Sequence, residues 1–376
     1  MKNRLQIPKN GSREPDNYLI SPCGDESGWS LGAANEAVER AFQSGSFRIE
    51  QEKLLERCLG DTSEEHCQKV IDHFKTINTE AFVYYWLPGG GLEAISATWA
   101  MVGALWLTDD LVDRGEFVAP NERLLSGWHT LPAEVDAVYG RYQGGTTAEE
   151  LFDATVKRHA FTGDPRIDGH RRLIIWGTSV ARVYGRDSTY YQWVSEAARW
   201  AVCQQTSTLL MRRLEMSQVD VDDLLSYREQ DGATTMTQWF MASCAGSEIP
   251  AFSERRQVIR DMLTYSGLHV ALANDILSHG RDKTEICRCS NFVEYQHLHL
   301  RDEGASLRAT IRQCNSLMMK FVDTVRCVDK EDAAGQFFAA SCSRMLRANI
   351  LWSLEANRYK AGHRVVAQLV TELERR

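Results

Sequence analysis

The sequence lacks the features that mark several large classes of protein. It has 8 prolines in 376 residues, and no Pro/Gly/Ser-rich linker, low-complexity tract or internal repeat, which argues against a repeat protein or a string of small domains. The longest largely apolar run, residues 95–107, is too short to cross a bilayer, and the polar N-terminus has no apolar signal core. We therefore expect a cytoplasmic protein with no membrane span.

An excess of positive charge is also missing, because the formal net charge is −8. This balance argues against a surface that binds polyanions, so nucleic acid is not an expected partner. The 10 cysteines are scattered without the paired spacing of a zinc site or the density of a disulfide scaffold. They are typical of reduced thiols in a cytosol-like compartment.

What the sequence does contain is helical periodicity. Apolar residues recur at three- and four-residue intervals, and no convincing series of alternating strands interrupts them. The predicted fold class is therefore all-α. We expect one large domain over residues 19–376, with residues 1–18 poorly ordered. The periodic ranges are 35–58, 92–112, 172–216, 254–279, 305–328 and 333–358.

The first motif that carries chemistry is acidic and closes a long apolar stretch. A helix predicted to follow the breaker Pro88-Gly89-Gly90-Gly91 runs toward Asp109, Asp110 and Asp113. Carboxylates are unfavourable near the negative end of a helix dipole, so three of them there indicate a bound cation. The alternative is a solvated helix end that leads into a charged loop.

The second motif places Asn274, Ser278 and Asp282 at strict four-residue intervals. Residues at this spacing lie along one face of a helix, and with a rise of ~1.5 Å per residue the three would span roughly 12 Å. All three side chains carry oxygen, the ligand atom that Mg²⁺ prefers. The two motifs thus suggest the walls of one magnesium site that handles a diphosphate, although an ordinary polar helix face is the alternative for the second.

With these two motifs the chain resembles the class I terpene synthases of the microbial, single-domain type, which carry an aspartate-rich motif and an Asn/Ser/Glu-type triad. Asp282 departs from the family, which more often has Glu there; the shorter side chain could alter the distance to a metal. The resemblance implies an α-helical bundle around a central active-site cavity and a prenyl diphosphate substrate. It also implies three Mg²⁺ ions, with Asp109 and Asp113 on one side and the triad on the other.

Further matches extend the resemblance over residues 82–360. Arg228, Asp231 and Gly232 resemble the family's diphosphate-sensing arginine, linker aspartate and effector backbone on a broken helix. Glycine suits such a break, because without a side chain the backbone can adopt unusual dihedral angles. The pair Arg358-Tyr359 resembles the family's terminal Arg-Tyr, and Arg281 its basic residue within the triad motif. The residues expected to bind the diphosphate are Arg228, Arg281, Arg358 and Tyr359.

Aromatic side chains are candidates for the wall of a carbocation pocket, because an aromatic face stabilises a nearby cation by roughly 0.5 to 2 kcal/mol. Trp106 stands three residues before Asp109, where the family tends to place such a ring. The alternative for each is an ordinary core aromatic. The other candidates are Phe82, Trp86 and Trp352.

The sequence Asp220-Val221-Asp222-Asp223 matches the Asp-x-Asp-Asp pattern of proton-initiated cyclases, but those belong to separate helical domains. We interpret it instead as a helix N-terminus, where aspartate caps free amides and matches the positive end of the dipole.

The resemblance favours a sesquiterpene synthase that acts on farnesyl diphosphate, with a diterpene synthase that uses geranylgeranyl diphosphate as the main alternative. A chain-elongating prenyl diphosphate synthase shares the fold and the metal chemistry but carries two aspartate-rich motifs. A non-catalytic, all-helical interaction protein is the alternative of another class. A family tendency toward dimers is the only basis for expecting a homodimer.

Overall fold

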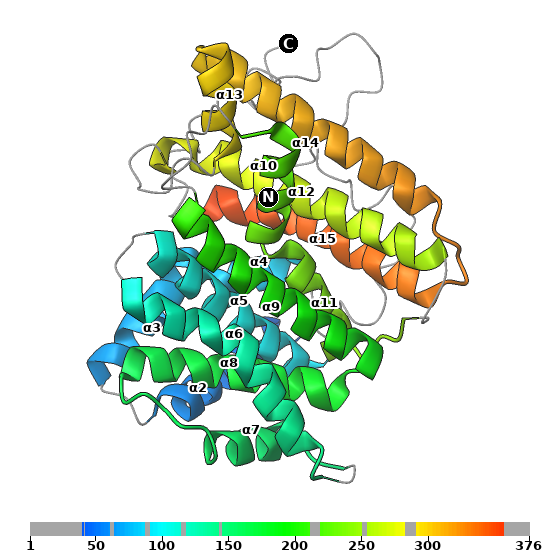
Figure 1. The fold of residues 1–376 in the computed structure, drawn as a ribbon. Coiled ribbons are helices and arrows are strands. Elements are labelled where there is room, and N and C mark those ends of the chain that lie inside the picture. The colour runs from blue at the N-terminus through cyan, green and yellow to red at the C-terminus, as the bar shows by residue number, and fades with distance from the viewer. Residues whose placement is uncertain are drawn as a thin grey trace. The chain divides into compact units, whose positions relative to one another are not determined.

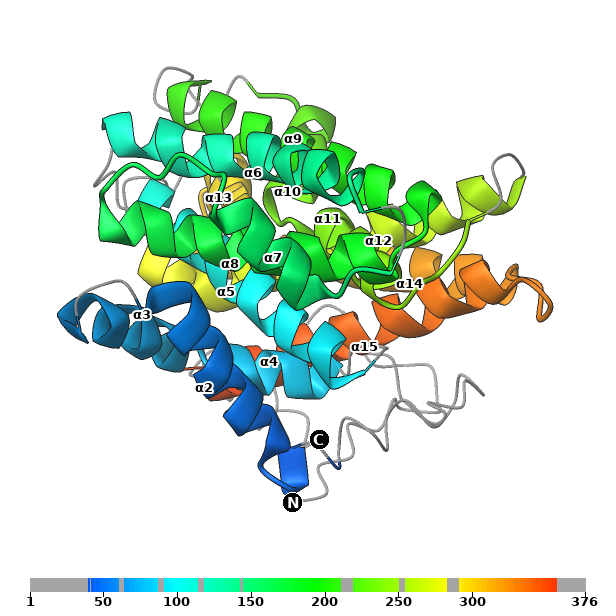
Figure 2. The same cartoon turned by 90° about the horizontal axis from the view of Figure 1, so that it is seen from below.

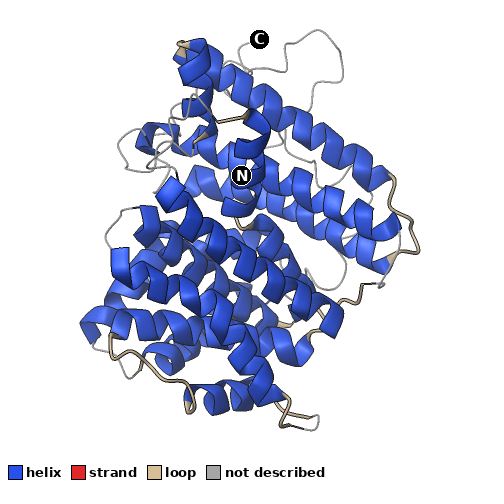
Figure 3. Cartoon of the chain, viewed as in Figure 1, coloured by secondary structure: helices blue, strands red, loops and turns tan. Residues whose placement is uncertain are grey.

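The chain folds into α-helices. The structure, a computed structural model, describes residues 40, 42–60, 64–86, 91–113, 118–142, 145–210, 219–249, 254–282 and 291–356. Within these ranges every long regular element is an α-helix, and no strand occurs (Figure 3). The all-α prediction is confirmed.

The described residues fall into two compact units. The C-terminal unit comprises those of Leu209–Thr234 and Glu254–Arg376, and the N-terminal unit comprises those of Leu31–Thr208 and Thr235–Ser253. A single domain over residues 19–376 stays a prediction. Residues 1–18 lie outside the described residues.

Helix α12 is the centre of the C-terminal unit and packs against α14, α15, α10 and α13 (Figure 1). Leu268, Leu272 and Ile276 form its apolar stripe in the core cluster with α13 and α14. The stripe that carries Asn274 is offset from it by two residues, or about 200° around the helix. The polar stripe is therefore turned away from that core cluster. The helices are α10 (Val221–Asp231), α12 (Glu254–Asp282), α13 (Phe292–Leu300), α14 (Glu303–Arg326) and α15 (Ala333–Glu355).

Helix α5 is the most deeply buried helix segment of the N-terminal unit, since every residue from 94 to 104 is buried. A helix that is apolar all round requires such enclosure, and α8, α2, α4 and α6 supply it (Figure 2). Its bounds agree to within one residue with the periodic range 92–112. The helices are α2 (Ser46–Leu59), α3 (Glu64–Ile77), α4 (Thr79–Trp86), α5 (Leu92–Asp113), α6 (Val118–Tyr139), α7 (Ala148–Val156), α8 (Pro165–Tyr184), α9 (Asp187–Leu210) and α11 (Thr234–Cys244).

None of the helices in the described part of the chain combines the length and the apolar character needed to span a lipid bilayer. The described cysteines are all free thiols.

A buried polar contact ties α8 to the end of α5. The His170 Nε2 atom lies 2.7 Å from the Thr108 hydroxyl and 3.0 Å from the Ala104 carbonyl oxygen, and the Trp128 indole donates to the same hydroxyl at 3.3 Å. The Thr108 hydroxyl also donates to the Ala104 carbonyl oxygen, at 2.9 Å. Because a carbonyl oxygen can only accept, Nε2 carries the proton of a neutral ring. Burial lowers the pKa of His170 to about 4.

This depressed pKa predicts a pH dependence of stability. Since the unfolded chain takes up the His170 proton near pH 6.5 and the folded chain only near pH 4, the contribution of His170 is present above pH 6.5 and lost as the pH falls through 4. The loss amounts to at most about 3 kcal/mol. Urea unfolding between pH 7 and pH 4 should show this slope in the wild type and a shallower one in His170→Gln. Parallel curves for the two proteins would contradict the assignment.

Candidate active site

The oxygen-bearing triad lies on α12 as its spacing predicts. Ser278 is buried, Asn274 and Asp282 are partly buried, and the Oδ1 atom of Asn274 is buried without a hydrogen-bond partner. A buried acceptor left unpaired costs about 1 to 3 kcal/mol, so this atom is suited to a ligand that enters later. An amide oxygen, a hydroxyl and a carboxylate are all acceptable ligands for Mg²⁺.

Mg²⁺ commonly takes only one or two protein carboxylates and completes its shell with water and substrate phosphates. A triad with one carboxylate agrees with this coordination preference. Over the described residues, no group of three or more His, Cys, Asp or Glu side chains could hold a metal ion. By its donor chemistry alone, a triad with one carboxylate suits an ion whose shell is completed by oxygens from outside the protein.

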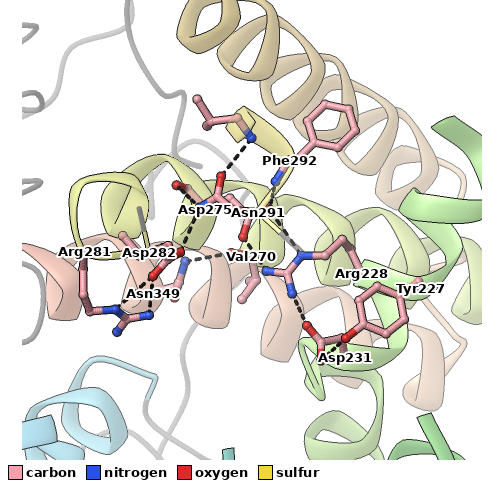
Figure 4. A network of polar contacts seen from close by, with 12 residues as sticks. Tyr227, Arg228, Asp231, Val270, Asp275, Arg281, Asp282, Asn291, Phe292 and Asn349 are labelled. Carbon is pink, nitrogen blue, oxygen red and sulfur yellow. Dashed lines mark hydrogen bonds and ion pairs between the residues drawn. The ribbon is translucent and has the colours of Figure 1, made fainter. Parts of the chain in front are cut away.

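The Asp282 carboxylate is held by donors on both of its oxygens. Arg281 donates to Oδ1 through Nε at 2.9 Å and Nη2 at 2.7 Å. The other oxygen, Oδ2, accepts the Ser278 hydroxyl and the Asn291 amide, the latter at 2.8 Å. Ser278 and Asp282 thus already point toward one another (Figure 4 shows the carboxylate with Arg281 and Asn291).

Arg228 on α10 sits in a buried network of ion pairs (Figure 4). Its guanidinium contacts Asp231 on its own helix and both carboxylate oxygens of Asp275 on α12, with Nε 3.2 Å from Oδ2. The Tyr227 hydroxyl donates to Asp231 at 3.0 Å, and the backbone N–H of Phe292 donates to Asp275 at 2.9 Å. The network joins α10, α12 and the start of α13.

The electrostatics of this network keep the arginine charged. Burial by itself would lower the pKa of Arg228, but the carboxylates of Asp275 and Asp231 outweigh it and raise that pKa. Burial raises the pKa of Asp275 to about 6, and the Arg228 guanidinium and the Phe292 amide oppose the rise. Near pH 7 the pair is ionised.

The helix break predicted near Gly232 is confirmed, because α10 ends at Asp231 and α11 begins at Thr234. The prediction that Gly232 adopts unusual dihedral angles is wrong. Gly232 has ordinary angles, φ −65° and ψ −3°, and the left-handed residue is Ala233, with φ 52°. A Cβ atom on Gly232 would lie 3.3 Å from the Arg228 carbonyl oxygen and 3.4 Å from the Ala271 Cβ. Glycine is thus suited to close packing of the break against α12.

The acidic motif of the N-terminal unit lies at the end of α5. Asp109 and Asp110 are half-buried, and His73 Nε2 on α3 lies 3.8 Å from the Asp110 carboxylate. Asp113 is the last residue of the helix, and its side chain lies outside what the structure describes. The triad belongs to the other unit, so the union of the two motifs in one site stays a prediction.

The aromatic candidates differ in exposure. The ring of Phe82 meets Trp106 edge-on at a centroid distance of 5.0 Å and Trp86 at 5.8 Å. Phe82 and Trp86 are buried, as is Trp352 on α15, whereas Trp106 is half-buried. Trp106 therefore keeps a partly uncovered ring one turn before the acids. Arg358 and Tyr359 lie outside the described residues.

The aspartate cluster ahead of α10 is a helix N-terminus, as predicted. Asp220 is the N-cap, and its carboxylate accepts the Asp222 backbone N–H at 2.8 Å.

Two contributors to the site escaped the sequence analysis. Asp275 could have been found, because an acid placed between the apolar residues 271–273 and 276–277 needs a buried partner. Asn291 gave only the weaker signal of an N-cap residue ahead of the apolar pair Phe292-Val293.

Comparison with known proteins connects the C-terminal unit with terpene synthases. Residues 197–324 match the family model for terpene synthase family 2, C-terminal metal binding, a range that contains Arg228 and the whole triad. A stretch of 142 residues is 25% identical to a (+)-T-muurolol synthase, (2E,6E)-farnesyl diphosphate cyclizing, from Streptomyces clavuligerus. That stretch covers 37% of this chain and 34% of the muurolol synthase, so it spans about a third of that protein.

The fold has close solved counterparts. A 2-methylisoborneol synthase from Streptomyces coelicolor, solved with Mg²⁺ and 2-fluoroneryl diphosphate, superposes with a TM-score of 0.63 over 93% of this chain and 98% of its own, at 16% identity. A germacradien-4-ol synthase from Streptomyces citricolor gives 0.57 over 81% and 94%, at 12% identity. Residues 197–324 thus carry a terpene synthase metal-binding region, and the helical fold is that of the solved microbial terpene synthases.

Removal of the Asp275 charge should destabilise the protein, because it leaves the buried Arg228 with one carboxylate instead of two. We expect Asp275→Asn to lower the free energy of unfolding by about 3 kcal/mol, measured by urea denaturation at pH 7.5. Asp223→Asn, an exposed acid in the first turn of α10, is the control and should cost no more than about 1 kcal/mol. Equal losses in the two variants would contradict a stabilising ion pair.

Proposed function

We propose that this protein is a Mg²⁺-dependent terpene cyclase. It ionises a linear prenyl diphosphate, farnesyl diphosphate in the first place, and cyclises the carbocation to a sesquiterpene hydrocarbon or alcohol. The observation that carries the proposal is the buried, unpaired Asn274 Oδ1 on the helix stripe of Ser278 and Asp282, inside a region that matches a terpene synthase metal-binding family.

Different residues would have different roles in breaking the carbon–oxygen bond of the substrate. Asn274, Ser278 and Asp282 would hold Mg²⁺ on one side, and Asp109 with Asp113 on the other, with three ions in all as in the family. When bound, Mg²⁺ supplies the positive charge that stabilises the departing diphosphate. Asp110 is proposed as a further catalytic residue beside these ligands.

Arginines would add charge from the protein itself. Arg281 is next to Asp282 and 23% exposed, and its planar guanidinium suits phosphate oxygens. Arg358 and Tyr359 are proposed to bind the same group. Arg228 would report the arrival of the diphosphate through Asp231 and Gly232 at the helix break. Its ion pairs to Asp275 and Asp231 give it a defined starting position.

The cation left behind needs a dry, aromatic surrounding. Trp106 is the best candidate because its ring is only half-buried and stands one turn before Asp109. Support for farnesyl diphosphate comes from the muurolol synthase relative, whose name describes it as cyclising (2E,6E)-farnesyl diphosphate. Geranylgeranyl diphosphate is the alternative, and location in the cytoplasm is part of the proposal.

The test is product analysis with defined substrates. Purified protein is incubated with geranyl, farnesyl or geranylgeranyl diphosphate, with Mg²⁺ or with EDTA, and the organic extract is analysed by gas chromatography–mass spectrometry. A cyclic C15 product that requires Mg²⁺ is expected. A C20 product alone would move the substrate assignment to diterpenes, and longer prenyl diphosphates would indicate chain elongation. No product and no released diphosphate from any substrate would refute the cyclase proposal.

The triad is tested by substitution on α12. Asn274→Ala removes the unpaired oxygen and should reduce kcat/KM for farnesyl diphosphate on the order of 100-fold or more, because a metal ligand is lost. Gln257→Ala is the matched control, since Gln257 is an exposed side chain on the same helix that pairs only locally with Asp261. The control should keep its activity. Equal activity in the two variants would exclude Asn274 from metal binding.

A further inference from the structure

Asn291 is a buried side chain whose every polar group is engaged. Its Oδ1 accepts the Val293 backbone N–H at 2.9 Å and so caps α13. Its Nδ2 donates to the Asp275 carbonyl oxygen at 2.9 Å and to the Asp282 carboxylate at 2.8 Å. The residue is 1% exposed. One amide therefore connects the start of α13 to two points on α12 that are seven residues apart.

The orientation of this amide follows from its neighbours. Nδ2 faces two oxygens that only accept, and Oδ1 faces a backbone N–H that only donates. A flipped amide would lose all three hydrogen bonds and place acceptor against acceptor. Asn291 thus presents a fixed N–H to the Asp282 carboxylate.

A fixed donor matters at this position because Asp282 is the last residue of α12, where helices fray. Its side chain is also one methylene shorter than the glutamate more common in the family. The Ser278 hydroxyl and the Asn291 amide meet on the same oxygen of Asp282. Asn291 therefore holds that carboxylate on the side of Ser278.

We propose that Asn291 is a positioning residue that keeps the Asp282 carboxylate aligned with Ser278 and Asn274 for binding Mg²⁺. It acts through Asp282 and contacts neither substrate nor metal. The inference rests on the proposed function, because it assumes that the triad binds Mg²⁺. Beyond that function, the inference states that the position of the Asp282 carboxylate depends on Asn291 at the start of α13.

The experiment measures metal binding without turnover. Melting temperature is followed as Mg²⁺ is titrated in the presence of inorganic diphosphate, for wild type and for Asn291→Ser. Serine is an equally good N-cap, so α13 keeps its cap, but the hydroxyl is too short to reach Asp282 as well. Loss of such an outer hydrogen bond to a ligand costs about 10- to 100-fold in metal affinity. We expect the Mg²⁺ concentration at half-saturation to rise at least about tenfold.

Asp332→Ser is the matched control. Asp332 is a buried N-cap in the same unit whose carboxylate accepts the Gly335 N–H of α15 at 3.1 Å, and no hydrogen bond to the triad is found for it. The Asp332→Ser substitution should lower the melting temperature of the metal-free protein but leave the Mg²⁺ concentration at half-saturation unchanged. If Asn291→Ser does not fold, Asn291→Gly provides the second variant, because glycine also serves as an N-cap.

The outcomes separate the two proposals. If the wild type shows no Mg²⁺-dependent rise in melting temperature with diphosphate, the proposed function fails. If the wild type responds and the Asn291 variants keep its half-saturation, the positioning role is refuted while the triad stands. A selective tenfold loss in the Asn291 variants, with normal behaviour of Asp332→Ser, supports the inference.

Discussion

The C-terminal unit depends on the ion pair between Arg228 and Asp275. Both side chains are almost completely withdrawn from water, with exposed fractions of 8% and 2%, and an unpaired charge in such a place would cost several kcal/mol. The pairing therefore restricts how α10 can lie on α12. Because the Phe292 N–H binds the same carboxylate, the start of α13 is tied to this point as well.

The candidate ligands are arranged around that pair. Asp275 is adjacent in sequence to Asn274, yet the two side chains have opposite requirements: the carboxylate is fully satisfied, whereas the amide oxygen has no partner. Satisfied polar networks give rigidity, and an unsatisfied buried acceptor such as the Asn274 oxygen calls for an explanation, of which ion binding is one. A rigid base with one unpaired oxygen suits a site that must keep its shape before the metal and the diphosphate arrive.

The break between α10 and α11 shows how a correct prediction can have the wrong cause. Glycine at 232 suggested unusual backbone angles, but the strained angle falls on Ala233, and a Cβ atom on Gly232 would lie 3.3 Å from the Arg228 carbonyl oxygen and 3.4 Å from the Ala271 Cβ of α12. Conformational preference is a property of one residue and can be judged from the sequence. A close approach between two helices depends on where the second helix lies, which the sequence does not state.

Local periodicity was enough to predict α5, α12, α14 and α15 and the alignment of Asn274, Ser278 and Asp282, because residues four apart share a helix face whatever surrounds them. It missed the break after Tyr184, where the predicted run 172–216 is divided between α8 and α9. The N-terminus of α10 could also be predicted from the sequence, since a cap acts on amides within one turn. Only the tertiary structure decided that Arg228 pairs with Asp275, 47 residues away, and that Asn291 reaches Asp282. Those contacts arise when separate helices pack, and their partners are chosen by the burial of charge and of hydrogen-bonding groups rather than by spacing along the chain.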